Sequence, residues 1–329
     1  MFNIWVTNRC NLNCAYCYEK KKSDIEFNMD LNALYKFIEK YNVQEDVVIN
    51  FHGGEPLLNF PAIKEISYVI KDKYPTAELS FTTNGTIINN DILDFMYEMQ
   101  CEVSISIDGD KNTHDRYRIN KVGEGSHRLV MNTISRMKSR GITNIRYRMT
   151  FNSHTVDRLF DNINWLFVNR INNIVASPDY FDADWDEKSL ENYENTLYRL
   201  KNYYNNIESG QLYISLLDNN LVKYKGRCNV GSGSYNIAVD GSVYPCTYTV
   251  GNLKYKIGNI MEGIDKKRVR SLQEICYQEI NECDRCDYKM HCNAYRCRFV
   301  NEIIVGDINK VAPIICNFDN INYKFFVHS

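Results

Sequence analysis

Three cysteines stand close together near the start of the chain, in the stretch VTNRCNLNCAYCYE (6–19). Cys10, Cys14 and Cys17 have the spacing CxxxCxxC and directly follow a short apolar run. Three thiolates can hold three irons of a [4Fe–4S] cluster and leave the fourth iron free for another ligand. A structural zinc site would need a fourth ligand, and the nearest histidine in sequence, His52, belongs to a different loop. The spacing therefore indicates a cluster with an open iron, with zinc as the alternative.

A second set of cysteines lies from residue 228 onward. Its members are Cys228, Cys246, Cys283, Cys286, Cys292, Cys297 and Cys316. Because CxxC pairs also suit tetrahedral zinc, a zinc ribbon is the alternative to iron–sulfur clusters in this region. The two remaining cysteines, Cys101 before a strand-like run and Cys276 in a helical pattern, are expected to be structural thiols.

Composition restricts the classes of protein to consider. The chain is 44% hydrophobic and 24% charged with a net charge of −2, which gives no electrostatic case for nucleic acid or an anionic membrane. No segment approaches the ~20 apolar residues of a membrane span, and the N-terminus lacks the pattern of a secretory signal. We therefore expect a cytoplasmic protein, and in that reducing compartment cysteines favour metal ligation over disulfides.

Short apolar runs alternate with amphipathic stretches over the first half of the chain. Strands are predicted at 2–7, 46–51, 78–83, 102–108, 144–151 and 172–177. Helices are predicted at 31–41, 61–74, 90–99, 128–141, 157–170 and 186–206. Six βα units predict an α/β fold with a parallel sheet, as a partial (βα)6 barrel of the TIM type. In such a barrel the chemistry lies in loops at the carboxyl ends of the strands.

The pattern changes in the last third of the sequence. The stretch YNIAVDGSVYPC predicts a β-hairpin with Asp240 and Gly241 as its turn. From about residue 226 onward the chain is cysteine-rich, and we expect irregular structure there because inorganic clusters would replace a hydrophobic core. The predicted organisation is a barrel over 1–210 followed by a small cysteine-rich iron–sulfur domain over 211–329.

Three further motifs follow predicted strands: HGGEP (52–56), TNG within SFTTNGTIIN (80–89), and SISIDGDKNTHDRYR (104–118). Each alone could be an ordinary loop or a solvated surface. Together with CxxxCxYC they resemble the radical SAM enzymes, which bind S-adenosylmethionine (SAM) on the open iron. The resemblance implies that the GGE motif binds the SAM amino group, Ser106 the ribose and Arg118 the carboxylate, and an arginine fork suits a carboxylate. The implied SAM-binding residues are Tyr16, Gly53, Gly54, Glu55, Asn84, Ser106 and Arg118.

The resemblance also implies a reaction. One electron, from a donor such as flavodoxin or ferredoxin, enters the cluster, and SAM is cleaved to a 5′-deoxyadenosyl radical that abstracts hydrogen from a substrate carbon. The cofactors carry this step, while the protein orients them and excludes water. The motifs identify no catalytic acid or base.

The later cysteines resemble the SPASM extension of radical SAM enzymes, which holds two auxiliary [4Fe–4S] clusters, so the chain would carry three clusters. In that family the ligands of the two clusters alternate along the sequence, so the resemblance implies that the first auxiliary cluster would use Cys228, Cys246 and Cys297. The second would use Cys283, Cys286, Cys292 and Cys316. One departure is that four residues, not three, separate Cys292 from Cys297.

Two features bear on the substrate. Sulfatase-maturing members carry an eighth cysteine between the first two of this set, and this chain has none there. The first auxiliary cluster is therefore expected to have an open iron, filled either by a substrate cysteine thiolate or by water, a serine or a carboxylate. Sulfatase-maturing members also place an aspartate after the second SPASM cysteine, where this chain has Thr247.

The leading hypothesis is maturation of a ribosomally made peptide by a thioether or carbon–carbon cross-link. The first alternative is sulfatase-type oxidation of Ser or Cys to formylglycine, and the second is a non-catalytic iron–sulfur electron-transfer protein. The expected partners are an electron donor and a peptide or protein substrate, with a cysteine-containing substrate as one option. Because the chain starts almost at its first strand, a peptide-recognition domain is not expected ahead of it, and a separate recognition protein could supply that function.

Overall fold

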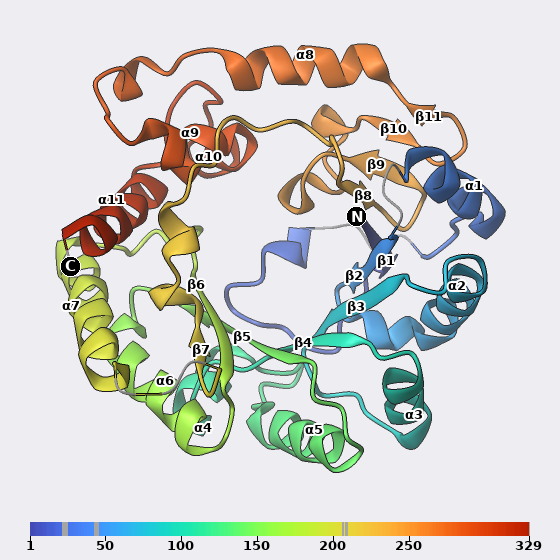
Figure 1. Ribbon diagram of the computed structural model, residues 1–329, viewed down its shortest axis with the longest axis horizontal. Coiled ribbons are helices and arrows are strands. Elements are labelled where there is room, and N and C mark those ends of the chain that lie inside the picture. The colour runs from blue at the N-terminus through green and yellow to red at the C-terminus, as the bar shows by residue number, and fades with distance from the viewer. Residues whose placement is uncertain (22–25, 43–45, 206, 208–209, 329) are drawn as a thin grey trace. The chain divides into compact units, whose positions relative to one another are not determined.

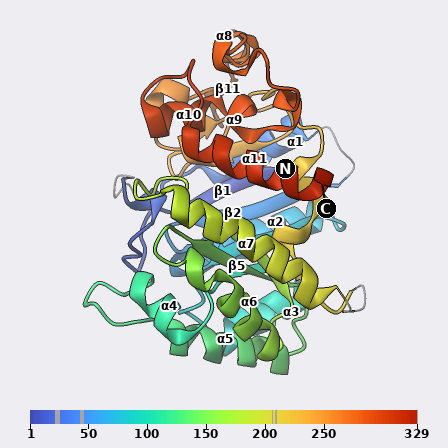
Figure 2. The ribbon, with the colours of Figure 1, turned by 90° about the vertical axis from the view of Figure 1, so that its left-hand side faces the viewer.

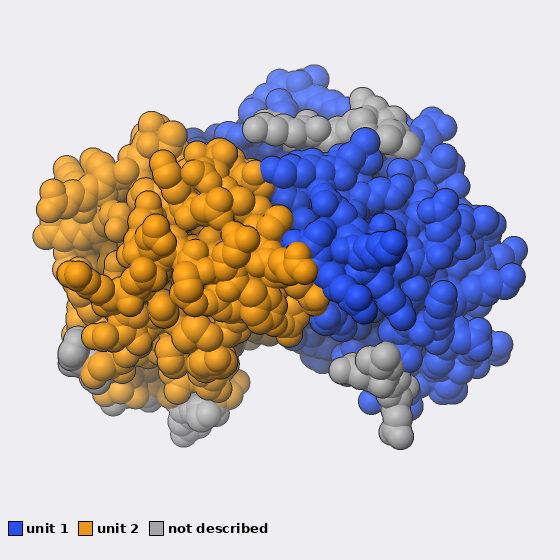
Figure 3. All heavy atoms as spheres, turned by 90° about the horizontal axis from the view of Figure 1, so that it is seen from above, with its two compact units in different colours: residues 1–106, 115–146, 230–272 blue, residues 107–114, 147–229, 273–329 orange. Residues whose placement is uncertain are grey.

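The computed structural model describes residues 1–21, 26–42, 46–205, 207 and 210–328. These residues form two compact units, which are coloured separately in Figure 3. Unit 1 contains residues 1–106, 115–146 and 230–272, and unit 2 contains residues 107–114, 147–229 and 273–329. Each unit thus combines segments from both halves of the sequence. The predicted domain boundary between residues 210 and 211 stays a prediction.

Parallel strands form the centre of unit 1. They are β1 (Phe2–Thr7), β2 (Val48–Gly53), β3 (Glu78–Thr83) and β4 (Glu102–Ser106), and they pair in chain order. Every residue of β1 is buried, as expected for a parallel strand covered on both faces. The second strand was predicted at 46–51 and is observed two residues later, because its pairing with β1 continues as far as Gly53. The fourth strand ends before its predicted limit, since the chain turns at Gly109, where φ is 109°.

Helices cover the outer side of these strands, as Figure 1 shows. They are α1 (Leu31–Tyr41), α2 (Phe60–Lys73), α3 (Asn90–Glu98) and α5 (His127–Ser139), close to the predicted ranges. Side chains cap two of them. Asp30 accepts a hydrogen bond from the backbone N–H of Ala33 at 3.1 Å, and Asn89 accepts one from that of Ile92 at 2.8 Å. A short helix between β4 and α5, α4, comprises Lys111–Tyr117.

A small antiparallel ribbon extends the sheet of unit 1 beyond β1. Its strands are β8 (Tyr235–Ile237), β9 (Ser242–Tyr244), β10 (Gly258–Asn259) and β11 (Gly263–Ile264). The predicted hairpin is confirmed as β8 and β9, with Gly241 at φ 78° in the turn. β8 pairs with β1 in parallel, and Phe2 lies opposite Tyr235. A late segment of the sequence is therefore part of the same sheet as the first strand.

Unit 2 contains a second group of parallel strands, in the order β5 (Ile145–Phe151), β6 (Asn173–Pro178) and β7 (Tyr213–Ile214). Its helices α6 (Leu159–Val168) and α7 (Glu187–Tyr204) correspond to the predicted ones. Asp186 caps α7 by accepting a hydrogen bond from the N–H of Ser189 at 2.8 Å. The short strand β7 was not predicted, because two residues carry too little periodicity.

The C-terminal region contains helices that the expectation of irregular structure did not include. The expected irregular structure is present before and between them, for example around the 3₁₀ turns Asn281–Cys283 and Lys289–His291. The helices are α8 (Lys266–Tyr277), α9 (Asn293–Arg296), α10 (Arg298–Val305) and α11 (Pro313–His328). Apolar side chains at helical spacing explain α11, which lies beside α7 in Figure 2. Phe318 contacts the ring of Tyr193 at 4.8 Å, and the Tyr193 hydroxyl donates to Asn322 Oδ1 at 2.7 Å. Among the described residues, no helix combines the length and the apolarity that crossing a membrane requires.

Candidate active site

The carboxyl ends of four parallel strands carry the motifs that the sequence singled out. Thr7 lies opposite Gly53 at the ends of β1 and β2, and Thr83 lies opposite Ile105 at the ends of β3 and β4. Because parallel strands end at one edge of the sheet, the CxxxCxxC, HGGEP and TNG loops all leave from the same side. Ser106 is the last residue of β4 and is 8% exposed.

Gly53 and Gly54 allow the chain before Cys10 to pack directly on the end of β2. A β-carbon on Gly53 would lie 2.4 Å from the carbonyl oxygen of Thr7, and one on Gly54 would lie 2.4 Å from that of Arg9. The Gly54 N–H donates to the Thr7 carbonyl at 3.0 Å, and the Glu55 N–H donates to the Arg9 carbonyl at 2.8 Å. The two glycines therefore fix the start of the cysteine loop, a role that the motif alone did not reveal.

The Glu55 carboxylate joins the HGGEP loop to the TNG loop. It is completely buried and accepts hydrogen bonds from the Thr83 hydroxyl at 2.8 Å, the Asn84 N–H at 2.7 Å and the Leu57 N–H at 3.1 Å. Burial raises the pKa of Glu55 to about 7, although these donors favour the charged form. The carboxylate thus has a structural role in holding two loops together, and its contact with the SAM amino group stays a prediction.

The TNG loop in turn contacts the cysteine loop. Asn84 Nδ2 donates to Cys10 Sγ at 3.7 Å and to Asn11 Oδ1 at 2.9 Å, and Asn11 Nδ2 donates to the Thr86 hydroxyl at 2.8 Å. The sequence analysis predicted Asn84 but missed Asn11, Thr83 and Thr86. Their signal was available, since each is a polar residue within or beside a motif that follows a strand.

A segment after α4 pairs with the cysteine loop and carries Arg118. The Asn13 N–H donates to the Ile119 carbonyl at 2.7 Å, and the Ala15 N–H donates to the Tyr117 carbonyl at 2.9 Å. The Arg118 guanidinium is 5.2 Å from the centre of the Tyr16 ring. Arg118 is only 7% exposed, so a cation held beside the cysteine loop favours an anionic group such as a carboxylate.

The three N-terminal thiols are half-buried on one loop. Burial raises the pKa of Cys10, the charges of Glu55 and Cys17 raise it further, and the Leu12 N–H, which donates to Cys10 Sγ at 3.4 Å, opposes the shift. Thiolate is the ligand form, so binding iron would release the protons of these thiols. A set of three thiols with no fourth ligand on the loop fits a cluster held at three irons.

Unit 2 contains the four cysteines predicted to hold the second auxiliary cluster, Cys283, Cys286, Cys292 and Cys316. This ligand set stays a prediction. The charges of Cys286 and Cys316 raise the pKa of Cys283 beyond the effect of its burial. Burial, followed by the charges of Cys286, Cys316 and Cys292, raises the pKa of Tyr288 to about 12. The donor set fits a cluster with four thiolate ligands.

Asp319 supports this group of thiols, and the sequence analysis missed it. It is 6% exposed and accepts hydrogen bonds from the Cys292 thiol at 3.2 Å, the Asn293 N–H at 2.6 Å and the Ala294 N–H at 3.2 Å. These bonds hold the start of α9 against α11. No group of three or more His, Cys, Asp or Glu side chains in the described ranges has the arrangement that a single metal ion requires.

The predicted ligands of the first auxiliary cluster are divided between the units. Cys246 belongs to unit 1, where it precedes a 3₁₀ turn, Thr247–Thr249, whose Thr249 hydroxyl donates to the Cys246 carbonyl at 2.7 Å. Cys228 and Cys297 belong to unit 2. Cys101 is 2% exposed, as predicted for a structural thiol.

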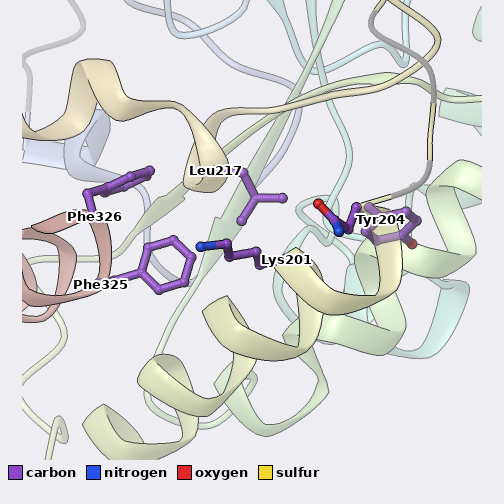
Figure 4. A pocket seen from close by; sticks show the side chains of 6 residues that line it. Lys201, Tyr204, Leu217, Phe325 and Phe326 are labelled. Carbon is purple, nitrogen blue, oxygen red and sulfur yellow. The ribbon is translucent and has the colours of Figure 1, made fainter. Parts of the chain in front are cut away.

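A pocket of about 340 Å³ in unit 2 contains none of the predicted site residues. Its lining side chains, drawn in Figure 4, are Lys201, Tyr204, Asn205, Leu217, Phe325 and Phe326. The Lys201 ammonium lies 5.6 Å from the centre of the Phe325 ring. We assign this pocket no part in the chemistry of the motifs.

Two family models match the chain. Residues 4–166 match the radical SAM superfamily, and residues 228–287 match SPASM, described as an iron–sulfur cluster-binding domain. The cysteine-type anaerobic sulfatase-maturating enzyme of Clostridium novyi is 30% identical over 78% of this chain and 75% of its own length. This chain belongs to the radical SAM enzymes that carry a C-terminal SPASM domain, as the motifs predicted. The SPASM match favours iron–sulfur clusters over the zinc ribbon as the role of the later cysteines.

Other relatives and solved structures agree with this assignment. The serine-type anaerobic sulfatase-maturating enzyme of Bacteroides thetaiotaomicron is 26% identical over 86% of this chain and 79% of its own. The structure described as native anSMEcpe with bound AdoMet has a TM-score of 0.79 at 19% identity, covering 100% of this chain and 96% of its own. The structure of Streptococcus suis SuiB bound to its precursor peptide SuiA has a TM-score of 0.70 at 12% identity, covering 96% of this chain and 75% of its own. The predicted fold, a partial α/β barrel followed by a SPASM domain, is confirmed.

Proposed function

We propose that this radical SAM enzyme is an oxidoreductase that modifies a side chain of a peptide or protein, and that oxidation of Ser or Cys to formylglycine is the favoured reaction. The observation that carries the proposal is the hydrogen-bonded assembly of the cysteine, GGE and TNG loops with Arg118 in unit 1. The choice of reaction is supported by the relatives described as sulfatase-maturating enzymes, which align over most of both chains. This order reverses the preference for cross-linking that the sequence alone suggested.

Side chains of unit 1 would bind the cofactors. Cys10, Cys14 and Cys17 would hold the cluster that, with SAM, supplies the 5′-deoxyadenosyl radical chemistry. The Arg118 fork would hold the SAM carboxylate, and Tyr16 would keep that fork in place by stacking against it at 5.2 Å. Glu55 would act mainly by joining the loops, because protein donors already occupy both carboxylate oxygens.

The proposal includes two auxiliary clusters on the later cysteines and an external electron donor of the flavodoxin or ferredoxin kind. Conversion of a serine CH2OH group to an aldehyde removes one hydrogen atom, one proton and one electron. The later cysteines would hold the auxiliary clusters, which would supply an acceptor for that electron, and a base must accept the proton. Thr247 stands where sulfatase-maturing members have an aspartate, and a hydroxyl is not a base at neutral pH, so another group must take the proton.

Peptide cross-linking is the second candidate, and Thr247 is the observation that favours it over formylglycine formation. A thioether joins a substrate sulfur to the carbon that has lost hydrogen, and it also removes two hydrogens from the peptide. SuiB, whose fold this chain shares, is described with a precursor peptide bound. The two reactions leave different functional groups, because only formylglycine is an aldehyde.

The first experiment tests the class of reaction. Anaerobically loaded protein is reduced in the presence of SAM, and 5′-deoxyadenosine is measured. We expect its release, and its absence would favour the non-catalytic electron-transfer alternative.

A second experiment separates the products, using serine- and cysteine-containing peptides encoded beside the gene. Formylglycine is detected with a hydrazide probe. A thioether gives no hydrazide product, lowers the peptide mass by two hydrogens and protects the thiol from alkylation. A hydrazide-reactive product supports the favoured reaction, and a thioether would replace it by the second candidate.

A further inference from the structure

Cys276 lies outside both predicted cysteine sets, yet its thiol contacts one of them. It is 2% exposed near the end of α8, and its thiol is hydrogen-bonded to that of Cys228. Two thiols, from positions 48 residues apart in the sequence, therefore meet in unit 2.

Hydrogen bonds on both sides of Cys228 hold it against this part of α8. Arg227 precedes Cys228, and its Nη1 donates to the carbonyl oxygen of Cys276 at 3.3 Å. Asn229 follows Cys228, and its Oδ1 accepts a hydrogen bond from the Tyr277 hydroxyl at 3.1 Å. The approach of the two thiols is thus fixed by their neighbours along the chain, independently of the contact between the sulfurs.

A buried cation lies beside the same thiols. Arg298 directly follows Cys297, is 0% exposed, and donates from Nη1 to the Ile308 carbonyl at 3.1 Å and from Nη2 to the Gln278 carbonyl. Its Nε has no hydrogen-bond partner among the described residues. A buried guanidinium with an unused donor favours an anionic group nearby, and a cluster with four thiolates carries net negative charge.

We propose that Cys276 is a thiolate ligand of the first auxiliary [4Fe–4S] cluster, beside the two predicted ligands of that cluster in unit 2, Cys228 and Cys297. The inference rests on the proposed function, because the family implies the cluster. On binding, the Cys276 S–H bond breaks, a sulfur–iron bond forms, and the proton passes to solvent. Cys276 would replace the eighth cysteine that this chain lacks. It would also close the iron that the sequence left open for a substrate thiolate, which favours formylglycine formation over a thioether.

The test begins with a variant that lacks the SAM-binding cluster. Replacing Cys10, Cys14 and Cys17 by alanine leaves two auxiliary clusters and about 8 irons per chain. Adding Cys276→Ala is expected to lower the content to about 7 irons, with the EPR signal of a [3Fe–4S] cluster, or to about 4 if the cluster is lost. Cys101→Ala in the same background removes an equally buried thiol and should leave the iron content unchanged.

Two measurements keep the inference falsifiable if Cys276→Ala folds poorly. Circular dichroism compares its folding with that of the Cys101→Ala control. In the background with Cys276 intact, a small added thiol should not change the EPR spectrum of the reduced auxiliary clusters, because no iron is open. Retention of about 8 irons with an unchanged spectrum in a folded Cys276→Ala variant would overturn the proposal, as would binding of the added thiol when Cys276 is present.

The experiment distinguishes a failure of this inference from a failure of the proposed function. Release of 5′-deoxyadenosine is measured with the wild-type chain. If it occurs while Cys276→Ala keeps all auxiliary iron, the inference fails and the function stands. If iron is lost but SAM is not cleaved, the inference stands and the function fails.

Discussion

Substitution of Gly54 by alanine tests whether the GGE glycines build the cluster loop. The added β-carbon would lie 2.4 Å from the Arg9 carbonyl oxygen and 2.7 Å from the Asn8 carbonyl oxygen. Both neighbours are backbone atoms, so no side chain can rotate away. Because ordinary contacts begin at about 3.5 Å, the chain before Cys10 must move by about 1 Å.

The size of the effect follows from the bonds that this movement breaks. The Gly54 N–H bond to Thr7 at 3.0 Å and the Glu55 N–H bond to Arg9 at 2.8 Å would both lengthen beyond hydrogen-bonding distance. Each lost bond costs about 1 kcal/mol, or up to about 3 kcal/mol if a buried group stays unpaired. We therefore expect the free energy of unfolding to fall by about 2–5 kcal/mol. The variant should also lose iron from the N-terminal cluster.

Gly258→Ala is the matched control. Its β-carbon would lie 2.3 Å from the Gly263 carbonyl oxygen, so it meets backbone in the same unit but between β10 and β11. Urea denaturation followed by circular dichroism should show both variants destabilised, whereas iron analysis should show loss from the N-terminal cluster only in Gly54→Ala. A Gly54→Ala protein that matches wild type within about 0.5 kcal/mol and retains its iron would refute the reasoning.

Three other perturbations test the site. Burial raises the pKa of Glu55 in the folded state to about 7. With SAM absent, the contribution of Glu55 to the free energy of unfolding should therefore be greatest below pH 4.5 and decline as pH rises through about 7. Urea titrations at several pH values should show this decline in the wild type and not in Glu55→Gln. Arg118→Lys, compared with Arg116→Lys, should weaken SAM binding about 10-fold or more in equilibrium dialysis, because lysine cannot form the bidentate fork; equal effects would contradict a specific role. Asp319→Ala should lower the free energy of unfolding by about 2–3 kcal/mol and release iron from the second auxiliary cluster, and unchanged iron would argue against its support of Cys292.

Much of the site could be predicted because its signals are local. The spacing of Cys10, Cys14 and Cys17 and the position of each motif after a strand depend only on neighbouring residues and on the alternation of strands and helices. The same alternation predicted the early elements, including the exact bounds of β1, β3 and α1. It failed for α11, where the abundance of cysteine in the region outweighed a helical apolar pattern.

The sequence by itself determined the class of chemistry: three thiols on one loop, glycines and an arginine after particular strands, and a later set of thiols. The tertiary structure decided which residues meet. Only folding brings β8 beside β1, Glu55 beneath the TNG loop, and Cys276 against Cys228. These contacts join segments tens to hundreds of residues apart, and local spacing and periodicity contain no information about such pairings. For that reason the sequence predicted a structural thiol at Cys276, and the proposal that it is a ligand depends on its contact with Cys228 in the fold.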